Sequence, residues 1–220
     1  MKVLGLVAII GCLVAFAGVA RAQEEIPPPQ GKGPVVVVAS GMSGVDHYRP
    51  VAREIAKLGY DVVLFDGNGM EGTHGAAVRQ DILIALQQPH ALPGKVALVG
   101  FSLGGGMSLF YGTQLSDLVA GVVVWYPATS FIHDIPGFVS RTKVPVLMFA
   151  GEDDHFRECC LIGQAHALAD AASQAGLPFQ LVTYPNTDHD FVLDGSHYNP
   201  AAYADAFQRT RAKLKEYLGQ

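Results

Sequence analysis

The sequence lacks three features that mark large classes of proteins. It has no repeated long apolar runs, although half of its residues are hydrophobic, so a multi-span membrane protein is excluded. Its 15 lysines and arginines are scattered and outnumbered by 20 acidic residues, so nucleic acid is not an expected partner. Its eight histidines show no H-E-x-x-H or comparable ligand spacing, so we expect no metal. No cofactor is expected either.

Cysteine is also scarce, and two of the three cysteines, Cys159 and Cys160, are neighbours. Adjacent Cα atoms lie about 3.8 Å apart, below the usual disulfide range, so this pair is not expected to form a disulfide that stabilises the fold. We predict two small apolar residues at a helix start, one of them facing the core. The alternative is a redox-sensitive ring near the functional site.

The first residues have the three parts of a secretory signal. Met1 and Lys2 precede an apolar stretch, and Ala20-Arg21-Ala22 forms a small-x-small cleavage site. We therefore predict a signal peptide over residues 1–22, export to the periplasm or medium, and no stable membrane association after its removal. An uncleaved membrane anchor is the alternative. Residues 23–34 are expected to form an extended leader, and residues 35–220 the folded domain.

Apolar strands alternate with amphipathic helices along the remaining chain. We expect strands at 35–39, 60–65, 95–100, 118–125, 144–150 and 179–184, and helices at about 46–58, 75–88, 103–115, 159–175 and from 200 onward. Asp46 and Asn199 are the expected caps of the first and last helices. This alternation predicts an α/β fold with a mostly parallel sheet and helices on both faces. Ligands are then expected at the carboxyl ends of the strands.

Gly100-Phe101-Ser102-Leu103-Gly104 is a G-x-S-x-G sequence directly between an expected strand and an expected helix. In that context the serine lies on a sharp turn with its hydroxyl exposed, and the glycines allow close approach of the neighbouring elements. A serine is a weak nucleophile without a base, so a histidine and an acid are needed nearby. Asp153 and Asp154 follow one later strand and His189 follows the next, which is the Ser, acid, His chain order of α/β-hydrolases.

Over nearly the whole predicted mature chain, the sequence resembles the dienelactone hydrolase branch of the α/β-hydrolase fold. The matching segments are Ser40-Gly41-Met42-Ser43-Gly44-Val45, Gly100-Phe101-Ser102-Leu103-Gly104-Gly105, Gly151-Glu152-Asp153-Asp154-His155-Phe156 and Asp188-His189-Asp190-Phe191. The resemblance implies Ser102, Asp154 and His189 as catalytic residues, with Asp154 chosen over Asp153. It also implies an oxyanion hole formed by the backbone N–H groups of Met42 and Leu103.

The chain departs from that family in two places. The best-known members have cysteine where this chain has Ser102, so the chain resembles the serine-using relatives. They also hold a substrate carboxylate with arginines, where this chain has Asp66-Gly67-Asn68-Gly69-Met70 and Val192-Leu193. The missing arginines argue against an anionic dienelactone as the substrate.

We therefore predict an exported serine hydrolase that cleaves small carboxylic esters or lactones through an acyl-enzyme. The alternatives are a non-catalytic binding protein with the same fold and an amide or peptide hydrolase with the same three residues. Residues 127–143 are expected to roof the pocket through Phe131, Ile132, His133 and Phe138. The remaining candidates for pocket walls, each with ordinary packing as its alternative, are His47, Tyr48, Trp125, Tyr126 and His155.

Overall fold

The structure is a computed structural model that describes residues 23–73 and 76–219. The predicted signal peptide, residues 1–22, lies outside the described residues. Among the residues that are described, no helix combines the length and the apolar character needed to cross a bilayer.

In the described part of the chain, seven strands form one sheet in the order β1-β3-β2-β4-β5-β6-β7. They are β1 (Gln23–Ile26), β2 (Val35–Ala39), β3 (Asp61–Phe65), β4 (Val96–Phe101), β5 (Val119–Trp125), β6 (Val146–Gly151) and β7 (Phe179–Tyr184). Strands β2 to β7 are parallel, and β1 pairs antiparallel with β3 at one edge. The predicted mostly parallel sheet is confirmed, and the first residues of the expected leader form its antiparallel edge strand.

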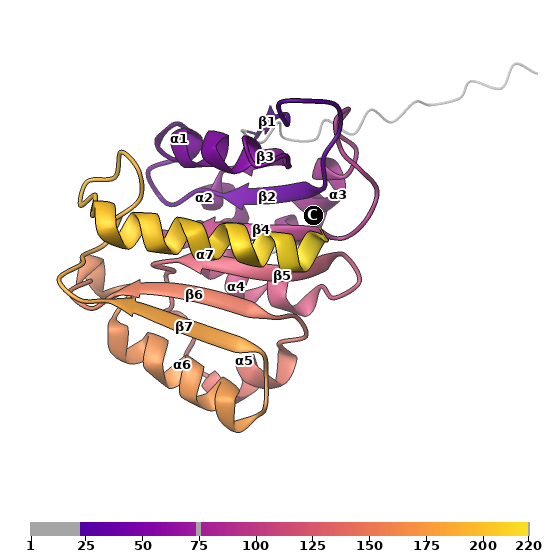
Figure 1. The fold of residues 1–220 in the computed structure, drawn as a ribbon. Helices are drawn as coiled ribbons and strands as arrows, with labels where there is room; N and C mark the ends of the chain where they lie inside the picture. Colours follow the sequence, from indigo (N-terminus) through magenta and orange to yellow (C-terminus); the bar gives the residue numbers. More distant parts are fainter. Residues whose placement is uncertain (1–22, 74–75, 220) are drawn as a thin grey trace, which may run out of the picture.

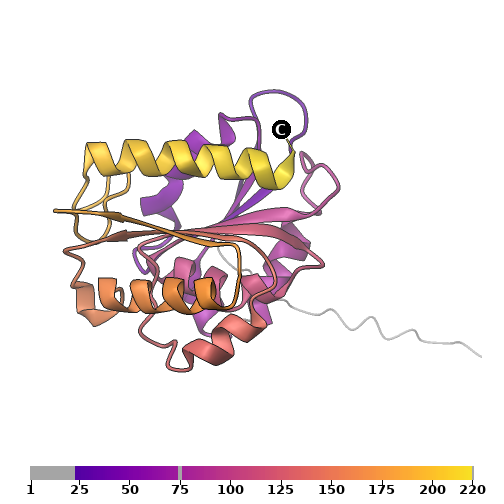
Figure 2. The same ribbon diagram turned by 60° about the horizontal axis from the view of Figure 1, so that its bottom comes forward.

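Helices cover both faces of this sheet. The helices are α1 (Val45–Ala56), α2 (Gly67–Glu71), α3 (Ala76–Ala85), α4 (Ser102–Phe110), α5 (Ile135–Arg141), α6 (Ile162–Gln174) and α7 (Pro200–Leu218), with short 3-10 turns η1 (Gly112–Gln114) and η2 (Phe156–Glu158). In Figure 1, α1 and the yellow helix α7 lie on the near face of the sheet. In Figure 2 the sheet separates α7 above from the orange helix α6 below.

The core has two layers because the central strands are buried on both faces. All five residues of β2 are buried: Val36 and Val38 pack toward α1 and α7, whereas Val35 and Val37 pack toward α3 and α4. This burial explains the continuous apolar runs in the sequence, since nearly every position of the central strands β2, β4, β5 and β6 is shielded from water.

Several helix ends differ from the sequence predictions, among them that of α3, which stops at Ala85 rather than at about residue 88. The cap of α1 is Gly44 rather than Asp46, which lies in the first turn of the helix. Helix α4 stops at Phe110 and continues as η1, and α6 begins at Ile162 rather than at residue 159. The Asn199 cap of α7 is confirmed, because its side-chain oxygen accepts a hydrogen bond from the backbone N–H of Ala202.

The strand order reverses between β2 and β4. From β2 the chain continues to β3 on one side, and the next strand, β4, returns to pair with β2 on the other side. The carboxyl ends of two strands flanking such a reversal leave a crevice where ligands bind in open α/β sheets. Ser40 follows β2 at this point, and Ser102 follows β4.

Candidate active site

Ser102 occupies the sharp turn between β4 and α4. Its φ of 48° lies in the left-handed region, which a non-glycine residue adopts only when its surroundings impose it. Gly104 allows the turn to pack against the end of β2, since a Cβ atom at this position would collide with the carbonyl oxygen of Ser40. The Gly104 N–H instead donates to that oxygen over 3.1 Å. The local sequence thus positions the serine hydroxyl at the strand end.

His189 and Asp154 lie beside this hydroxyl. The Nε2 atom of His189 is 2.9 Å from Ser102 Oγ, and its Nδ1 atom is 2.7 Å from Asp154 Oδ2. Asp154 follows β6 and His189 follows β7, so three strand ends contribute one side chain each. All three residues are buried, at 4%, 1% and 5% exposure for Ser102, Asp154 and His189. The structure brings together the three residues that the sequence predicted.

The choice between the two neighbouring aspartates follows from the same geometry. Asp153 is exposed, and its backbone N–H donates to the carbonyl oxygen of Thr187. The other carboxylate oxygen of Asp154 accepts the backbone N–H of Phe156 over 3.1 Å. Asp154 is therefore held from both sides, between the histidine ring and its own loop.

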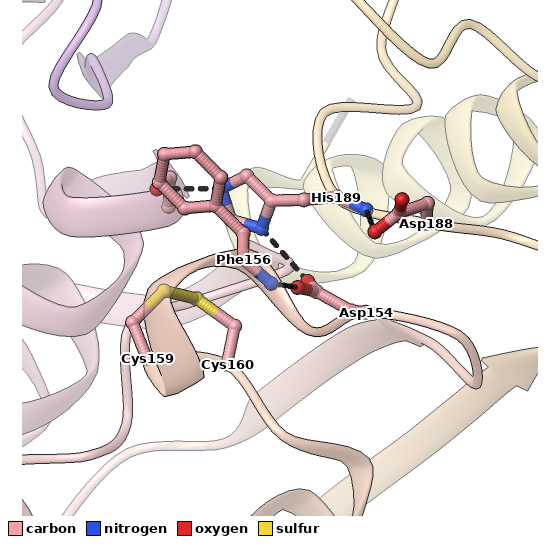
Figure 3. Close-up of a disulfide and its surroundings, with 7 residues drawn as sticks. Asp154, Phe156, Cys159, Cys160, Asp188 and His189 are labelled. Carbon is pink, nitrogen blue, oxygen red and sulfur yellow. Dashed lines mark hydrogen bonds and ion pairs between the residues drawn. A yellow bond between two sulfur atoms is a disulfide. The ribbon is translucent and has the colours of Figure 1, made fainter.

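Two aromatic rings hold the imidazole of His189, and no sequence pattern pointed to either contact. Phe156 stacks on it with ring centroids 4.6 Å apart and planes 8° apart, whereas Tyr126 presents an edge at 4.8 Å. Phe156 comes from the same loop as Asp154 (Figure 3). The loop after β6 therefore supplies both a hydrogen-bond partner, Asp154, and a packing surface, Phe156, to His189.

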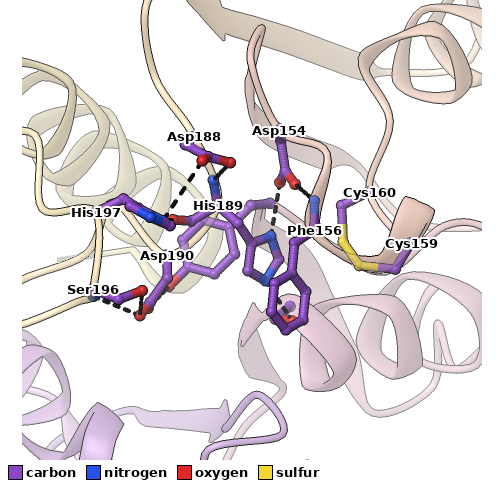
Figure 4. A network of polar contacts seen from close by, with 11 residues as sticks. Asp154, Phe156, Cys159, Cys160, Asp188, His189, Asp190, Ser196 and His197 are labelled. Atoms are coloured by element: carbon purple, nitrogen blue, oxygen red, sulfur yellow. Dashed lines mark hydrogen bonds and ion pairs between the residues drawn. A yellow bond between two sulfur atoms is a disulfide. The ribbon is translucent and has the colours of Figure 1, made fainter.

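Asp190, the residue after His189, fixes the segment that carries the histidine. Its carboxylate accepts hydrogen bonds from the Ser196 N–H and hydroxyl at 2.8 and 3.0 Å (Figure 4). It also accepts one from Tyr126 Oη at 3.3 Å and lies 3.0 Å from His47 Nε2. Burial, together with Tyr48 and Asp190, raises the pKa of Tyr126 well above its usual value, so this phenol remains a donor. Of the expected pocket walls, Tyr126 and His47 belong to this network.

The predicted oxyanion donors, the backbone N–H groups of Leu103 and Met42, come from the segments that follow β4 and β2. Leu103 is the second residue of α4, where a backbone N–H has no acceptor within its own helix. Met42 is in the loop after β2, is 47% exposed, and lines the cleft above Ser102. Both donors therefore follow one of the two strands, β2 and β4, between which the strand order reverses.

The cleft above Ser102 is small, with a volume of about 110 Å³. Its walls are Met42, Ser43, Tyr48, Ser102, Phe156, His189, Asp190, Ser196 and His197. The predicted roof is wrong: Ile132 and Phe138 are buried in the core on the α3 and α4 side of the sheet, and neither Phe131 nor His133 lines this cleft. Trp125, which is fully buried, and the exposed His155 do not line it either.

Cys159 and Cys160 form a disulfide and lie before the first residue of α6, so the prediction of two small apolar residues at a helix start is wrong. The expectation that one side chain faces the core is confirmed by Cys160, which is 4% exposed. The Cys159 carbonyl accepts the N–H groups of Thr129 and Ser130, which ties the pair to the loop after β5. Both sulfur atoms and a ring nitrogen of His189 lie within 4.8 Å of one another, as the arrangement in Figures 3 and 4 illustrates.

A mostly parallel sheet with helices on both faces, and a serine at the sharp turn between β4 and α4, define an α/β-hydrolase fold. The sequence model of the dienelactone hydrolase family matches residues 68–218, more than half of the chain. The chain therefore belongs to the dienelactone hydrolase family.

Individual relatives are distant. The chain is 29% identical over 148 residues to acyl-protein thioesterase 1 of Gibberella zeae, covering 63% of this chain and 60% of that protein. It is 27% identical over 130 residues to protein usf of Aquifex pyrophilus, covering 57% and 53%. The chain thus spans less than two thirds of the length of these curated relatives. A crystal structure of the dienelactone hydrolase-like promiscuous phosphotriesterase P91, from metagenomic libraries, matches with a TM-score of 0.71 and 22% identity over 86% of this chain and 88% of that chain.

Proposed function

We propose that this protein is a serine hydrolase that cleaves small carboxylic esters or lactones by way of an acyl-enzyme. The observation that carries the proposal is the continuous hydrogen-bonded path from Ser102 Oγ through the two ring nitrogens of His189 to Asp154. A buried serine on a strained turn, with a histidine in hydrogen-bond range, has the geometry that nucleophilic catalysis requires.

The contacts assign the proton positions. A carboxylate can only accept hydrogen bonds, so the Nδ1 atom of His189 carries the hydrogen that is shared with Asp154. Nε2 is then the free base, and it accepts the proton of Ser102 as Oγ attacks the carbonyl carbon. Asp154 stabilises the imidazolium that forms, and the imidazolium then donates its proton to the leaving alcohol.

The second half of the reaction reuses the same groups. Nε2 removes a proton from water, the hydroxide attacks the acyl-serine, and the proton returns to Ser102 Oγ as the acid leaves. In both halves negative charge develops on the carbonyl oxygen. The N–H groups of Leu103 and Met42 are the proposed donors to that oxygen.

The size and charge of the cleft favour a small substrate. A volume of about 110 Å³ lies well below the several hundred Å³ of a pocket for a drug-sized ligand. No arginine or lysine is among the residues that line it. We therefore propose a short, uncharged acyl group or a small lactone as the substrate.

Hydrolysis of p-nitrophenyl acetate and p-nitrophenyl octanoate by the purified protein tests this function. We expect the acetate to be cleaved with a higher kcat/KM, and Ser102→Ala to lose at least about a thousandfold in kcat. Ser130→Ala, which removes an exposed hydroxyl, is the matched control and should retain full activity. An unchanged rate in Ser102→Ala would contradict the proposal, and activity confined to anilide substrates would favour an amide hydrolase.

We further propose that the protein is exported after removal of residues 1–22, on the basis of the sequence pattern of that segment. Cell fractionation followed by amino-terminal sequencing tests this. A chain that begins at Gln23 in the periplasm or medium would support export, and an intact chain in the membrane fraction would support an uncleaved anchor.

A further inference from the structure

A second group of ionisable side chains lies at the edge of the sheet formed by β1 and β3, remote from Ser102. Its members are Glu25 of β1, Asp61, the first residue of β3, and His90, in the loop before β4. One potential ligand atom from each of the three side chains lies within 4.8 Å of the other two. The serine site does not use any of these residues.

The backbone places these three side chains on one face. Glu25 pairs with Val63, two residues after Asp61, and alternate residues of neighbouring strands point the same way. The loop that carries His90 is tied to the chain before β2, because Gly33 N–H donates to the His90 carbonyl over 3.0 Å. His90 Nδ1 lies 2.9 Å from Glu25 Oε1.

Asp61 makes this cluster unusual. It is fully buried at 0% exposure, and neither of its carboxylate oxygens has a hydrogen-bond donor among the described residues. Its neighbour Glu25 is also a carboxylate, so two acidic side chains lie side by side here with His90 as the third member. A buried carboxylate without a donor is costly unless a cation compensates it.

We propose that Glu25, Asp61 and His90 bind one divalent first-row transition-metal ion, Zn²⁺ being the best fit, which fastens β1 to the edge of the sheet. Two carboxylates balance the charge of a divalent ion. The imidazole favours Zn²⁺ over Ca²⁺ and Mg²⁺, which prefer sites made of oxygen ligands. Asp61 thereby gains a positive partner for its two buried oxygens.

The geometry requires only modest side-chain movement. Donors bound to one Zn²⁺ at about 2.0–2.2 Å lie about 3.3 Å apart, and the pair formed by His90 and Glu25 is already near that spacing. The side chains of Glu25 and His90 are 20% and 43% exposed, so both can adjust and the ion can reach them from solvent. Water completes the tetrahedral coordination.

Calorimetric titration of the chelator-treated protein with Zn²⁺ tests this site. We expect one ion per chain with a Kd below about 10 µM, and at least tenfold weaker binding in Glu25→Gln and in His90→Gln. These variants keep the buried Asp61, so the test does not depend on whether Asp61→Asn folds. His166→Gln, which removes an exposed histidine of α6, is the matched control and should bind as the wild type does.

Hydrogen exchange in the peptide that contains β1 tests whether the ion stabilises the pairing of β1 with β3. Zn²⁺ should slow this exchange about tenfold or more in the wild type and leave it unchanged in His90→Gln. Ester hydrolysis by His90→Gln should equal that of the wild type, since the two sites share no residue. Absence of Zn²⁺ binding, binding that survives both ligand substitutions, or unaltered exchange in the wild type would overturn the proposal.

Discussion

Phe156 stacks on the imidazole of His189, with ring planes only 8° apart and centroids 4.6 Å apart. The backbone N–H of the same residue donates to Asp154, the carboxylate that contacts the Nδ1 atom of that imidazole. One residue therefore contacts both partners of the hydrogen bond between His189 Nδ1 and Asp154.

Loss of this ring should weaken catalysis without unfolding the protein. We expect Phe156→Ala to lower kcat about three- to tenfold, because an aromatic pair contributes about 0.5–1.5 kcal/mol, and Phe156→Tyr to retain near-wild-type kcat. Leu92→Ala is the matched control, since Leu92, in the loop before β4, has 38% exposure against 37% for Phe156. Equal losses in the Phe156→Ala and Leu92→Ala proteins would remove the special role of the stack.

The two adjacent aspartates should behave very differently. Asp154→Asn should lower kcat about a thousand- to ten-thousandfold, because an amide neither stabilises the imidazolium nor favours hydrogen on Nδ1. Asp153→Asn changes the same chemistry one residue away on an exposed side chain and should keep kcat within about twofold of the wild type. Steady-state ester hydrolysis measures both, and a larger loss in Asp153→Asn would show that the wrong acid has been assigned.

Gly104 should be irreplaceable for a steric reason. A methyl group at this position would overlap the carbonyl oxygens of Ser40 and Ala39, both of which are backbone atoms that cannot rotate away. We expect Gly104→Ala to lower the free energy of unfolding by more than about 3 kcal/mol.

Gly163 provides the control for this substitution. It lies in α6, and a methyl group there would meet no atom within 4 Å, so Gly163→Ala should raise the free energy of unfolding by about 0.5–1 kcal/mol. Urea unfolding followed by circular dichroism measures both variants. A stability loss in Gly104→Ala of less than about 1 kcal/mol would contradict the close packing of the turn on β2.

Reduction of the Cys159–Cys160 disulfide should cost little global stability. A bond between adjacent residues closes almost no loop, so the chain-entropy contribution is about 1 kcal/mol against about 4–5 kcal/mol for a loop of roughly a hundred residues. We expect dithiothreitol to lower Tm by no more than about 4 °C. The Cys159→Ala/Cys160→Ala protein should show no Tm change on the same treatment. A fall of more than about 10 °C in the wild type would contradict a minor role for this bond in stability.

Much of the fold could be predicted from local patterns. The apolar runs predicted β2 to β6 because these parallel strands are buried on both faces. The edge strand β7 is less buried, but its limits also agree with the prediction. Strand β1 carries two glutamates and gains its structure from pairing with β3, which a local pattern cannot show. Helix α6 starts late because Cys159 ends the turn η2 and Leu161, with a ψ of 135°, is the N-cap of the helix.

The site was predictable only in part, for a related reason. Ser102, Asp154 and His189 could be found because each follows a strand in a recognisable order. Phe156, Tyr126 and Asp190 act through contacts between loops that are distant in the sequence, and no spacing rule reports those contacts. The roof was wrong because residues 135–141 form α5 and direct Phe138 into the core.

Covalent labelling of the serine tests the central claim most directly. A fluorophosphonate probe should add once to the purified protein, and peptide mass spectrometry should place the adduct on Ser102. His189→Ala should label at least about a hundredfold more slowly because Oγ loses its base. Failure to label, or an adduct on Ser43 or Ser196, the other serines of the cleft, would contradict the assignment of Ser102 as the nucleophile.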